Sequence, residues 1–350
     1  MRSIGMVTRL SRAFGVAAAL SLAGPAPAAW SAAEAGVLAH IQARGHLICG
    51  VGEGPRGYST LSGDGVWSGI STDFCRALAA AVLGNRDAVK FRPVTKGERF
   101  APLQSGDIDV LSRNIAITSS HDAGQGVHFP GVLVFDGLGF MVRRSQGVAS
   151  ALELSGARIC VLAESADAER IGDYFGALRM PFEVSRLDKW QDAAMTYFNK
   201  GCQVLAADVS TLALARQDFP DPGAHIILPE TAGKQPVGPA VREGDEEWFG
   251  IVRWTLYALI AAEELGITSS NVEAMKAPTT VEARRFLGID ADVGGRLGLP
   301  PNWTLQVIKQ VGNYGEMFER NLGLKSPLKL ERRLNNLAGN GGLHYAPSFR

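Results

Sequence analysis

The sequence predicts an α/β protein with two lobes, the first of which is discontinuous in the chain. Strand-like and helix-like segments alternate from residue 45 onward, and the same alternation starts again near residue 158. A stretch rich in Pro and Gly at 236–241 then leads into a largely helical C-terminal part. Alternation of this kind is typical of α/β folds. We therefore expect two lobes joined by two crossings of the chain, near residues 142–145 and 234–238.

The first block contains the clearest helix. Ser71 or Thr72 is a suitable N-cap, Phe74 and Leu78 recur at helical spacing, and Gly84 is a suitable end. The other elements expected in this block are strands at Leu47–Val51, 90–94, 108–111 and 138–142, and a short helix at 98–104.

The second block repeats the pattern before the chain becomes helical. Its expected strands are 158–162, 203–207 and 225–228, and its expected helices are 165–178 and 188–200. After the return crossing, helices are expected at 245–265, 272–276, 280–287 and 305–322.

The N-terminus has the features of an export signal. Three arginines precede the ten-residue apolar stretch 14–23, and residues 26–28 offer an A-x-A cleavage site. This pattern predicts that residues 1–28 are a secretory signal peptide. A membrane anchor is the alternative, but about ten apolar residues cannot span a bilayer core that needs about 20. We expect the mature chain to be a soluble, exported protein.

Composition excludes some partners. The 350 residues include 35 basic and 35 acidic ones, and 46% are hydrophobic, which excludes a disordered chain. With a net charge of zero and no run of basic residues, the sequence predicts no positively charged surface for nucleic acid or a membrane. Because residues 1–28 hold three Arg and no acidic residue, the mature chain is mildly acidic.

The four cysteines, Cys49, Cys75, Cys160 and Cys202, all lie in the mature part. An even number in an exported protein favours disulfides over metal binding. Three pairings are possible. We favour Cys49 with Cys75 and Cys160 with Cys202, because both members of each pair then fall within one expected lobe.

No motif predicts a cofactor, a metal or a catalytic nucleophile. Residues 52–57 match G-x-G-x-x-G after a strand, but loop-forming residues follow where a dinucleotide site needs a helix. The chain has no C-x-x-C or H-E-x-x-H and no nucleophile signature. We expect neither cofactor nor metal, and no enzymatic activity.

Stretches along the whole mature chain match one known family. They are LICGV at 47–51, DFCRA at 73–77, ERF at 98–100, LQSG at 103–106, DVLSRN at 109–114, GPAVR at 238–242, WF at 248–249, IVRWTL at 251–256, IKQVGNYGE at 308–316 and GGLHYAP at 341–347. On these residues the sequence resembles the periplasmic solute-binding proteins of amino-acid ABC importers, family 3. It is most similar to the branch that binds general polar L-amino acids, which shares its long C-terminal tail and its cysteine positions.

The resemblance implies the two-lobed periplasmic binding protein fold, type II or Venus-flytrap, with a two-strand hinge. It implies a first lobe at 37–142 and 239–350 that includes a C-terminal extension, and a second lobe at 143–238. It also implies a monomer that binds a small polar solute, delivers it to an inner-membrane ABC permease and performs no chemistry.

The resemblance further implies how the solute is held. In similar proteins a first-lobe Arg and Thr and a second-lobe Gly-Thr bind the α-carboxylate, a second-lobe Asp binds the ammonium, and an aromatic ring forms a platform. Here the Thr and Arg correspond to Ala116 and His121, and the Gly-Thr-Thr to residues 164–166. The Asp is retained as Asp208 and the platform as Tyr58. The candidate ligand-binding residues are Tyr58, Asn114, Ala116, His121, Glu164, Ser165 and Asp208.

These replacements predict a changed specificity. Histidine carries only part of a positive charge at pH 7, whereas arginine is fully charged, so the carboxylate loses its strongest partner. The hypothesis is a diverged binding protein for an amine, a modified amino acid or another small polar metabolite.

Other interpretations stay open. Asp208 is also a suitable helix N-cap, Tyr58 a loop aromatic and His121 a surface substitution. The alternative functions are a periplasmic dehydratase-like enzyme, in which Glu164 or His121 supplies the acid or base, and a sensory or accessory protein that has lost solute binding.

Overall fold

The computed structural model describes residues 36–350 except 53–55, 96, 164, 277–279 and 291. The expected signal peptide, 1–28, lies outside the described residues. Within the described part no helix has both the length and the apolar character needed to cross a membrane.

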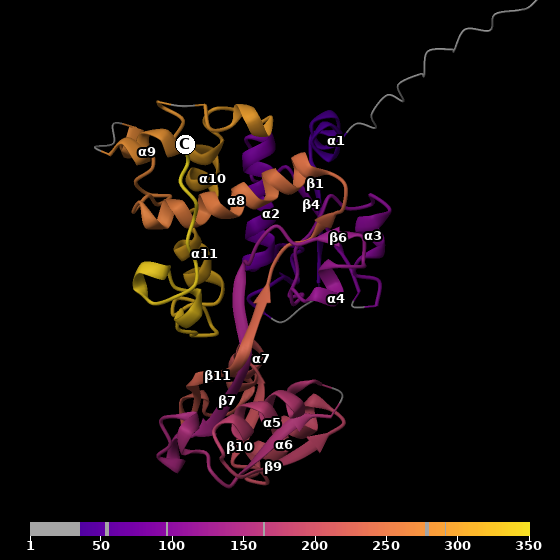
Figure 1. Ribbon diagram of the computed structural model, residues 1–350, viewed down its shortest axis with the longest axis vertical. Coiled ribbons are helices and arrows are strands. Elements are labelled where there is room, and N and C mark those ends of the chain that lie inside the picture. Colours follow the sequence, from indigo (N-terminus) through magenta and orange to yellow (C-terminus); the bar gives the residue numbers. More distant parts are fainter. Residues whose placement is uncertain (1–35, 53–55, 96, 164, 277–279, 291) are drawn as a thin grey trace, which may run out of the picture. The chain divides into compact units, whose positions relative to one another are not determined.

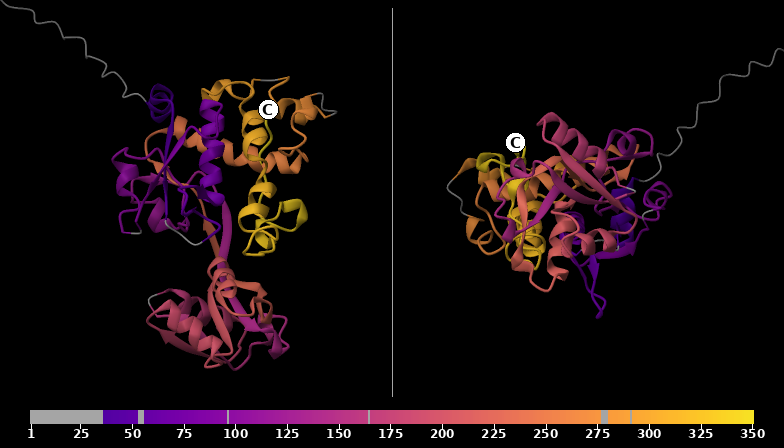
Figure 2. Two further views of the ribbon diagram at one scale, coloured as in Figure 1. Left: turned by 180° about the vertical axis from the view of Figure 1, so that it is seen from behind. Right: turned by 90° about the horizontal axis from the view of Figure 1, so that it is seen from below.

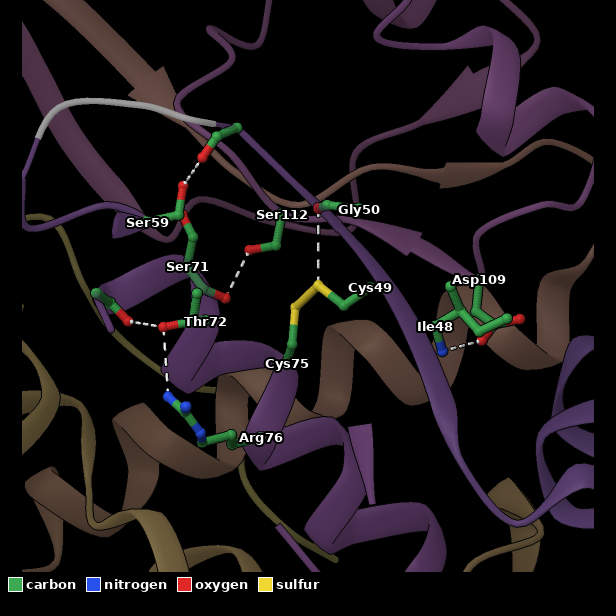
Figure 3. The surroundings of a disulfide bond; sticks show 12 residues. Ile48, Cys49, Gly50, Ser59, Ser71, Thr72, Cys75, Arg76, Asp109 and Ser112 are labelled. Carbon is green, nitrogen blue, oxygen red and sulfur yellow. Dashed lines mark hydrogen bonds between the residues drawn. A yellow bond between two sulfur atoms is a disulfide. The ribbon is translucent and has the colours of Figure 1, made fainter. Parts of the chain in front are cut away.

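A three-stranded parallel sheet and one buried helix form the centre of the first block (Figure 1). Strand β1 (Leu47–Val51) pairs with β4 (Val89–Pro93) on one side and β5 (Val110–Leu111) on the other. Helix α2 (Ile70–Leu83) packs against β1, and small alanine side chains let the two approach closely. The Cys49–Cys75 disulfide joins this strand to this helix (Figure 3).

The C-terminal helices complete this core. Helices α8 (Glu246–Glu264), α10 (Trp303–Val311) and α11 (Tyr314–Asn321) all contact α2. The sequence predicts one helix at 305–322, but the structure has two. The break occurs at Gly312, whose φ of +90° is left-handed, and Asn313 then caps α11 together with Glu316.

The second block is a five-stranded sheet in the order β11-β7-β10-β8-β9. Strands β8 (Ala157–Leu162), β9 (Phe182–Leu187) and β10 (Val204–Asp208) run parallel, and β7 (Val134–Arg143) and β11 (His225–Val237) are antiparallel neighbours. Alternate strand residues face opposite sides. Helix α5 (Asp167–Ala177) covers one face, while α6 (Trp190–Phe198), α7 (Val209–Asp218) and the Cys160–Cys202 disulfide occupy the other.

Both disulfides therefore have the pairing favoured from the sequence. Each lies inside one of the two blocks, which is the reason for which that pairing was preferred.

Strands β7 and β11 link the second sheet to the rest of the chain. They run side by side as a long antiparallel pair (Figures 1 and 2). At the Val237 end, the amide of Leu133 donates to the Val237 carbonyl at 2.8 Å, and the amide of Ile117 to the Pro236 carbonyl at 2.7 Å.

One expected strand has a different place. Residues 138–142 were expected at the end of the first lobe, but they pair with β10 and so belong to the five-stranded sheet. The division into lobes at 37–142, 143–238 and 239–350 stays a prediction. The pairing favours crossings nearer residues 134 and 237.

The other elements are short. The remaining helices are α1 (Val37–Arg44), α3 (Ala101–Gln104), α4 (Ser119–Asp122) and α9 (Val281–Phe286). Two small antiparallel sheets consist of β2 (Thr60–Leu61) with β3 (Trp67–Ser68) and β6 (Val127–His128) with β12 (Val241–Arg242). The 3₁₀ turns are Arg144–Gln146, Ala151–Glu153, Pro222–Ala224, Ala274–Lys276, Gly295–Leu297, Arg333–Asn335 and Ala338–Asn340.

Candidate functional site

A pocket of about 310 Å³ lies at the carboxyl ends of the parallel strands of the second sheet. Strands β8 and β10 end there, and helices α5, α6 and α7 begin there. Ligands of open α/β sheets bind at this edge. The lining residues are Leu162, Ser165, Ala166, Asp167, Arg170, Trp190, Ala207, Asp208, Thr211 and Gln235. We call this hollow the carboxylate pocket, after Asp208.

Asp208 occupies the N-cap position of α7, yet its side chain caps no helix amide. Instead, the Ser210 amide donates to Oδ1 of Asp136 at 3.3 Å, and the Ser210 hydroxyl donates to Oδ2 at 2.6 Å. Asp208 accepts a hydrogen bond from Nε2 of Gln235 at 3.1 Å. Because Asp136 accepts the hydrogen bond from the Ser210 amide in the first turn of α7, the Asp208 carboxylate keeps acceptor capacity toward the pocket.

The surroundings of Asp208 disfavour its negative charge. Burial, followed by the nearby carboxylates of Asp136 and Asp167, raises the pKa of Asp208 to about 7. The Gln235 hydrogen bond and Arg170 act in the opposite direction. A positive charge in the pocket would relieve this repulsion.

Arg170 supplies a guanidinium to the same pocket. Its NH1 donates to Oε1 of Gln235 at 2.8 Å and lies 3.8 Å from a carboxylate oxygen of Asp167. Gln235 thus bridges the basic Arg170 and the acidic Asp208. The carboxylate pocket therefore holds both signs of charge.

Sequence reasoning missed part of this pocket. Arg170 lies one turn after Asp167 in a helix that was expected, so its position on the same helix face could have been found. Trp190, Thr211 and Gln235 come from separate elements, and no local pattern connects them with Asp208.

Tyr58, the aromatic platform that the resemblance implies, is buried. Its side chain is 1% exposed, and its hydroxyl donates to Oδ2 of Asp136 at 3.1 Å. Burial, then the nearby Asp136 carboxylate, raises the pKa of Tyr58, and burial also raises the pKa of Asp136. The ring joins the loop after β1 to strand β7. Trp190, which is half-buried, is the aromatic residue among those that line the carboxylate pocket.

Of the first-block candidates, His121 lines a different hollow. Nδ1 of His121 is 2.8 Å from the carbonyl oxygen of Ala116, so these two candidates are in contact. His121 also packs edge-on against Phe100 and lines a hollow of about 420 Å³ that includes Arg99. Asn114 is exposed. The structure therefore brings Ala116 into contact with His121, and places Ser165 and Asp208 together in the carboxylate pocket.

Ser165 is partly occupied by local bonds. Its hydroxyl donates to the Leu162 carbonyl at 2.7 Å and accepts from the Asp167 amide at 3.3 Å, at the start of α5. Its neighbour Glu164 lies outside the described residues. Across the described ranges, no group of three or more His, Cys, Asp or Glu side chains is arranged to hold a metal ion.

Comparison with known proteins gives a consistent result. The family described as "Bacterial extracellular solute-binding proteins, family 3" matches residues 47–269. The general L-amino acid-binding periplasmic protein AapJ of Rhizobium johnstonii is 46% identical over 322 residues, covering 91% of this chain and 94% of AapJ. The glutamate/glutamine/aspartate/asparagine-binding protein BztA of Rhodobacter capsulatus is 42% identical over 320 residues, covering 91% of this chain and 95% of BztA.

A solved structure has the same fold. It is an ABC transporter periplasmic binding protein from Brucella ovis with glutathione bound, 43% identical to this chain. The alignment covers 90% of this chain and all of the other, with a TM-score of 0.77.

Proposed function

Since the chain belongs to family 3 of the bacterial extracellular solute-binding proteins, we propose that it delivers an amine-bearing amino acid or amino-acid derivative to an ABC importer, with the solute ammonium bound by Asp208. The observation that carries this proposal is the half-buried Asp208 carboxylate, which lines a pocket and caps no helix.

The charge at Asp208 favours a cationic group. A carboxyl whose pKa is raised to about 7 gains a partner when an ammonium enters, and the ion pair forms where water is partly excluded. A solute ammonium therefore stabilises the ionised form of Asp208 and lowers its pKa on binding.

The other end of the solute has partners as well. Arg170 and the N-terminal amides of α5 border the same pocket and favour a carboxylate. Amino acids and glutathione, which appear in the names of the relatives, carry both an ammonium and a carboxylate. In this proposal Arg170 takes over from the family arginine that His121 replaces, and Trp190 takes over from Tyr58.

The proposed cycle is that of a two-lobed transport protein. Residues 1–28 direct export and are removed, and the mature chain works as a periplasmic monomer. The solute binds first to the carboxylate pocket, and the first lobe then closes over it about β7 and β11, with Ala116, His121 and Asn114 on the approaching side. The permease recognises the closed form.

Titration calorimetry of the mature protein tests the solute class. The panel contains the twenty amino acids, glutathione, simple amines, and the matching acids that lack the amine. We expect binding within the amine-bearing group, and a 30-fold or greater loss of affinity in Asp208→Asn, about 2 kcal/mol or more.

Glu169→Gln is the matched control, because Glu169 is exposed on α5 and does not line the pocket. Its affinity should equal that of the native protein. Equal affinity in Asp208→Asn, or preference for solutes that lack an amine, would contradict the proposal.

One observation also supports an enzyme. A carboxyl with a pKa near 7 suits general acid or base catalysis at neutral pH. Turnover of a prephenate-like cyclic acid, lost in Asp208→Asn, would favour this alternative. The relatives that match over most of the chain are named as binding proteins, which supports transport.

A further inference from the structure

A second hollow, of about 360 Å³, lies where the C-terminal segment meets β11 and α7 of the second sheet. It shares no lining residue with the carboxylate pocket. Four basic side chains line it, together with the single acidic residue Glu331: Arg144, Arg216, Lys329 and Arg333. We call these four residues the basic cluster.

The basic cluster is held by backbone carbonyls. Each basic side chain donates to one or two carbonyl oxygens: Nε of Arg144 to Gly223 at 3.1 Å, NH2 of Arg216 to Leu328 at 2.7 Å, Nζ of Lys329 to Leu324 at 2.8 Å, and NH1 and NH2 of Arg333 to Leu228 at 2.8 Å and Ile227 at 3.0 Å. Carbonyls fix the direction of these groups without cancelling their charge. Among the described residues none of the four lies in an ion pair with a carboxylate.

Other titratable groups near the hollow act on the basic cluster in both directions. Burial lowers the pKa of Arg216, with Arg333 adding to the effect, and burial lowers the pKa of Arg333. Glu331 and Glu230 act in the opposite direction on Arg333. His225 is buried, and burial followed by nearby arginines lowers its pKa, so it adds no positive charge at neutral pH.

Two residues of the basic cluster have an unfavourable backbone conformation. Lys329 and Arg333 are non-glycine residues with φ of +53° and +46°, in the left-handed region that L-residues rarely occupy. The segment therefore keeps two cations beside Arg144 and Arg216 against both local geometry and mutual repulsion.

We propose that the basic cluster binds a small, multiply charged oxyanion, a phosphate or a polycarboxylate. Guanidinium groups match the planar oxygen pairs of both kinds of anion, and the lysine adds a point charge. A partly open hollow of about 360 Å³ has room for a small molecule. Since Lys329 and Arg333 belong to the C-terminal segment and Arg144 and Arg216 to the second block, the bound anion ties the segment to the sheet.

Thermal unfolding of the native mature protein tests the site, with sodium phosphate and sodium citrate compared with sodium chloride at equal ionic strength. We expect a saturable rise in Tm of about 2–4 °C with at least one of the two oxyanions. Isothermal titration under the same conditions measures the affinity directly. The phosphate and citrate arms distinguish the two sources of oxyanion.

The test variant is Arg144→Gln/Lys329→Gln, because both side chains are exposed and their replacement leaves the half-buried Arg216 and Arg333 in place. It should lose at least tenfold in oxyanion affinity and most of the Tm rise. The control Lys90→Gln/Arg158→Gln removes two exposed positive charges elsewhere and should behave like the native protein. Asp208→Asn should also retain oxyanion binding, which separates this site from the proposed solute site. Absence of saturable binding by both anions, or equal binding in test and control variants, would overturn the proposal.

Discussion

At the scale of single residues, two neighbouring carboxyl groups, the buried Asp136 and the half-buried Asp208, have different roles. Asp136 accepts hydrogen bonds from Tyr58 and from Ser210 at the start of α7. Asp208, at the N-cap position itself, accepts one from Gln235 and faces a pocket. The division matters because a carboxylate that caps a helix has less acceptor capacity left for a solute.

The raised pKa of Asp208 predicts how stability depends on pH in the absence of solute. The folded state keeps this proton up to about pH 7, whereas the unfolded carboxyl releases it near its ordinary pKa of 3.8. The free energy of unfolding therefore loses up to roughly 4 kcal/mol as pH rises from about 4 to 7, and the loss levels off above that.

Asp208→Asn should remove most of this decline. Urea unfolding at pH 4, 6 and 8 measures the effect, with Asp218→Asn as control because Asp218 is exposed at the end of the same helix. An identical pH slope in the native protein and Asp208→Asn would show that the carboxyl is not buried as described.

At the scale of elements, each disulfide ties a strand of one sheet to a neighbouring segment. Cys49 in β1 bonds to Cys75 in α2, and Cys160 in β8 bonds to Cys202 just before β10. The sequence separations are 26 and 42 residues, so the second bond closes the longer loop and constrains the unfolded chain more.

Replacing both members of either pair by alanine should lower the free energy of unfolding by about 2–4 kcal/mol. The Cys160→Ala/Cys202→Ala variant should lose at least as much as Cys49→Ala/Cys75→Ala, and calorimetry compares the two. An unchanged Tm after reduction of the native protein, together with an unchanged Tm in both double variants, would show that the bonds do not stabilise the fold.

At the scale of the whole molecule, the long strands β7 and β11 are the natural place for a hinge. Only this pair continues from the second sheet to the contacts with Leu133 and Ile117, within the part of the chain that the structure describes. Two strands resist separation but allow bending and twisting, which suits lobe closure.

Small-angle scattering with in-line chromatography tests this mechanism. The mature chain should elute with the mass of one protomer, and its radius of gyration should fall when the solute identified by calorimetry is saturating. In Asp208→Asn the fall should require at least 30-fold more solute. A dimer mass, or an unchanged radius at saturation, would contradict the proposed cycle.

The order of elements was largely predictable, because strand and helix periodicities are local. The end of α2 at Gly84 follows from sequence preferences alone, and so does the choice of disulfide pairs once two blocks are recognised. The N-cap expected at Ser71 or Thr72 was wrong, because α2 begins at Ile70 after Gly69 and the Thr72 hydroxyl donates back to the Gly69 carbonyl at 2.8 Å. The single helix expected at 305–322 was wrong, because periodicity continues through Gly312 while the backbone turns there.

The site was less predictable. Asp208 and Ser165 were named from the sequence and share a pocket, but Arg170 was overlooked, and Gln235 reaches Asp208 from a strand 27 residues away. The sequence does not show that the Tyr58 ring is buried or that its hydroxyl bonds to Asp136 in β7.

The sequence by itself determined the α/β class, the export signal as a prediction, and the family to which the chain belongs, since all three are carried by local patterns and by motifs. The tertiary structure decided which carboxylate caps α7 and which faces a pocket, and it brought Arg144 and Arg216 beside Lys329 and Arg333. The physical reason is that burial and charge are properties of neighbours in space, and these neighbours lie far apart in the chain, such as Asp136 and Ser210 at a separation of 74 residues.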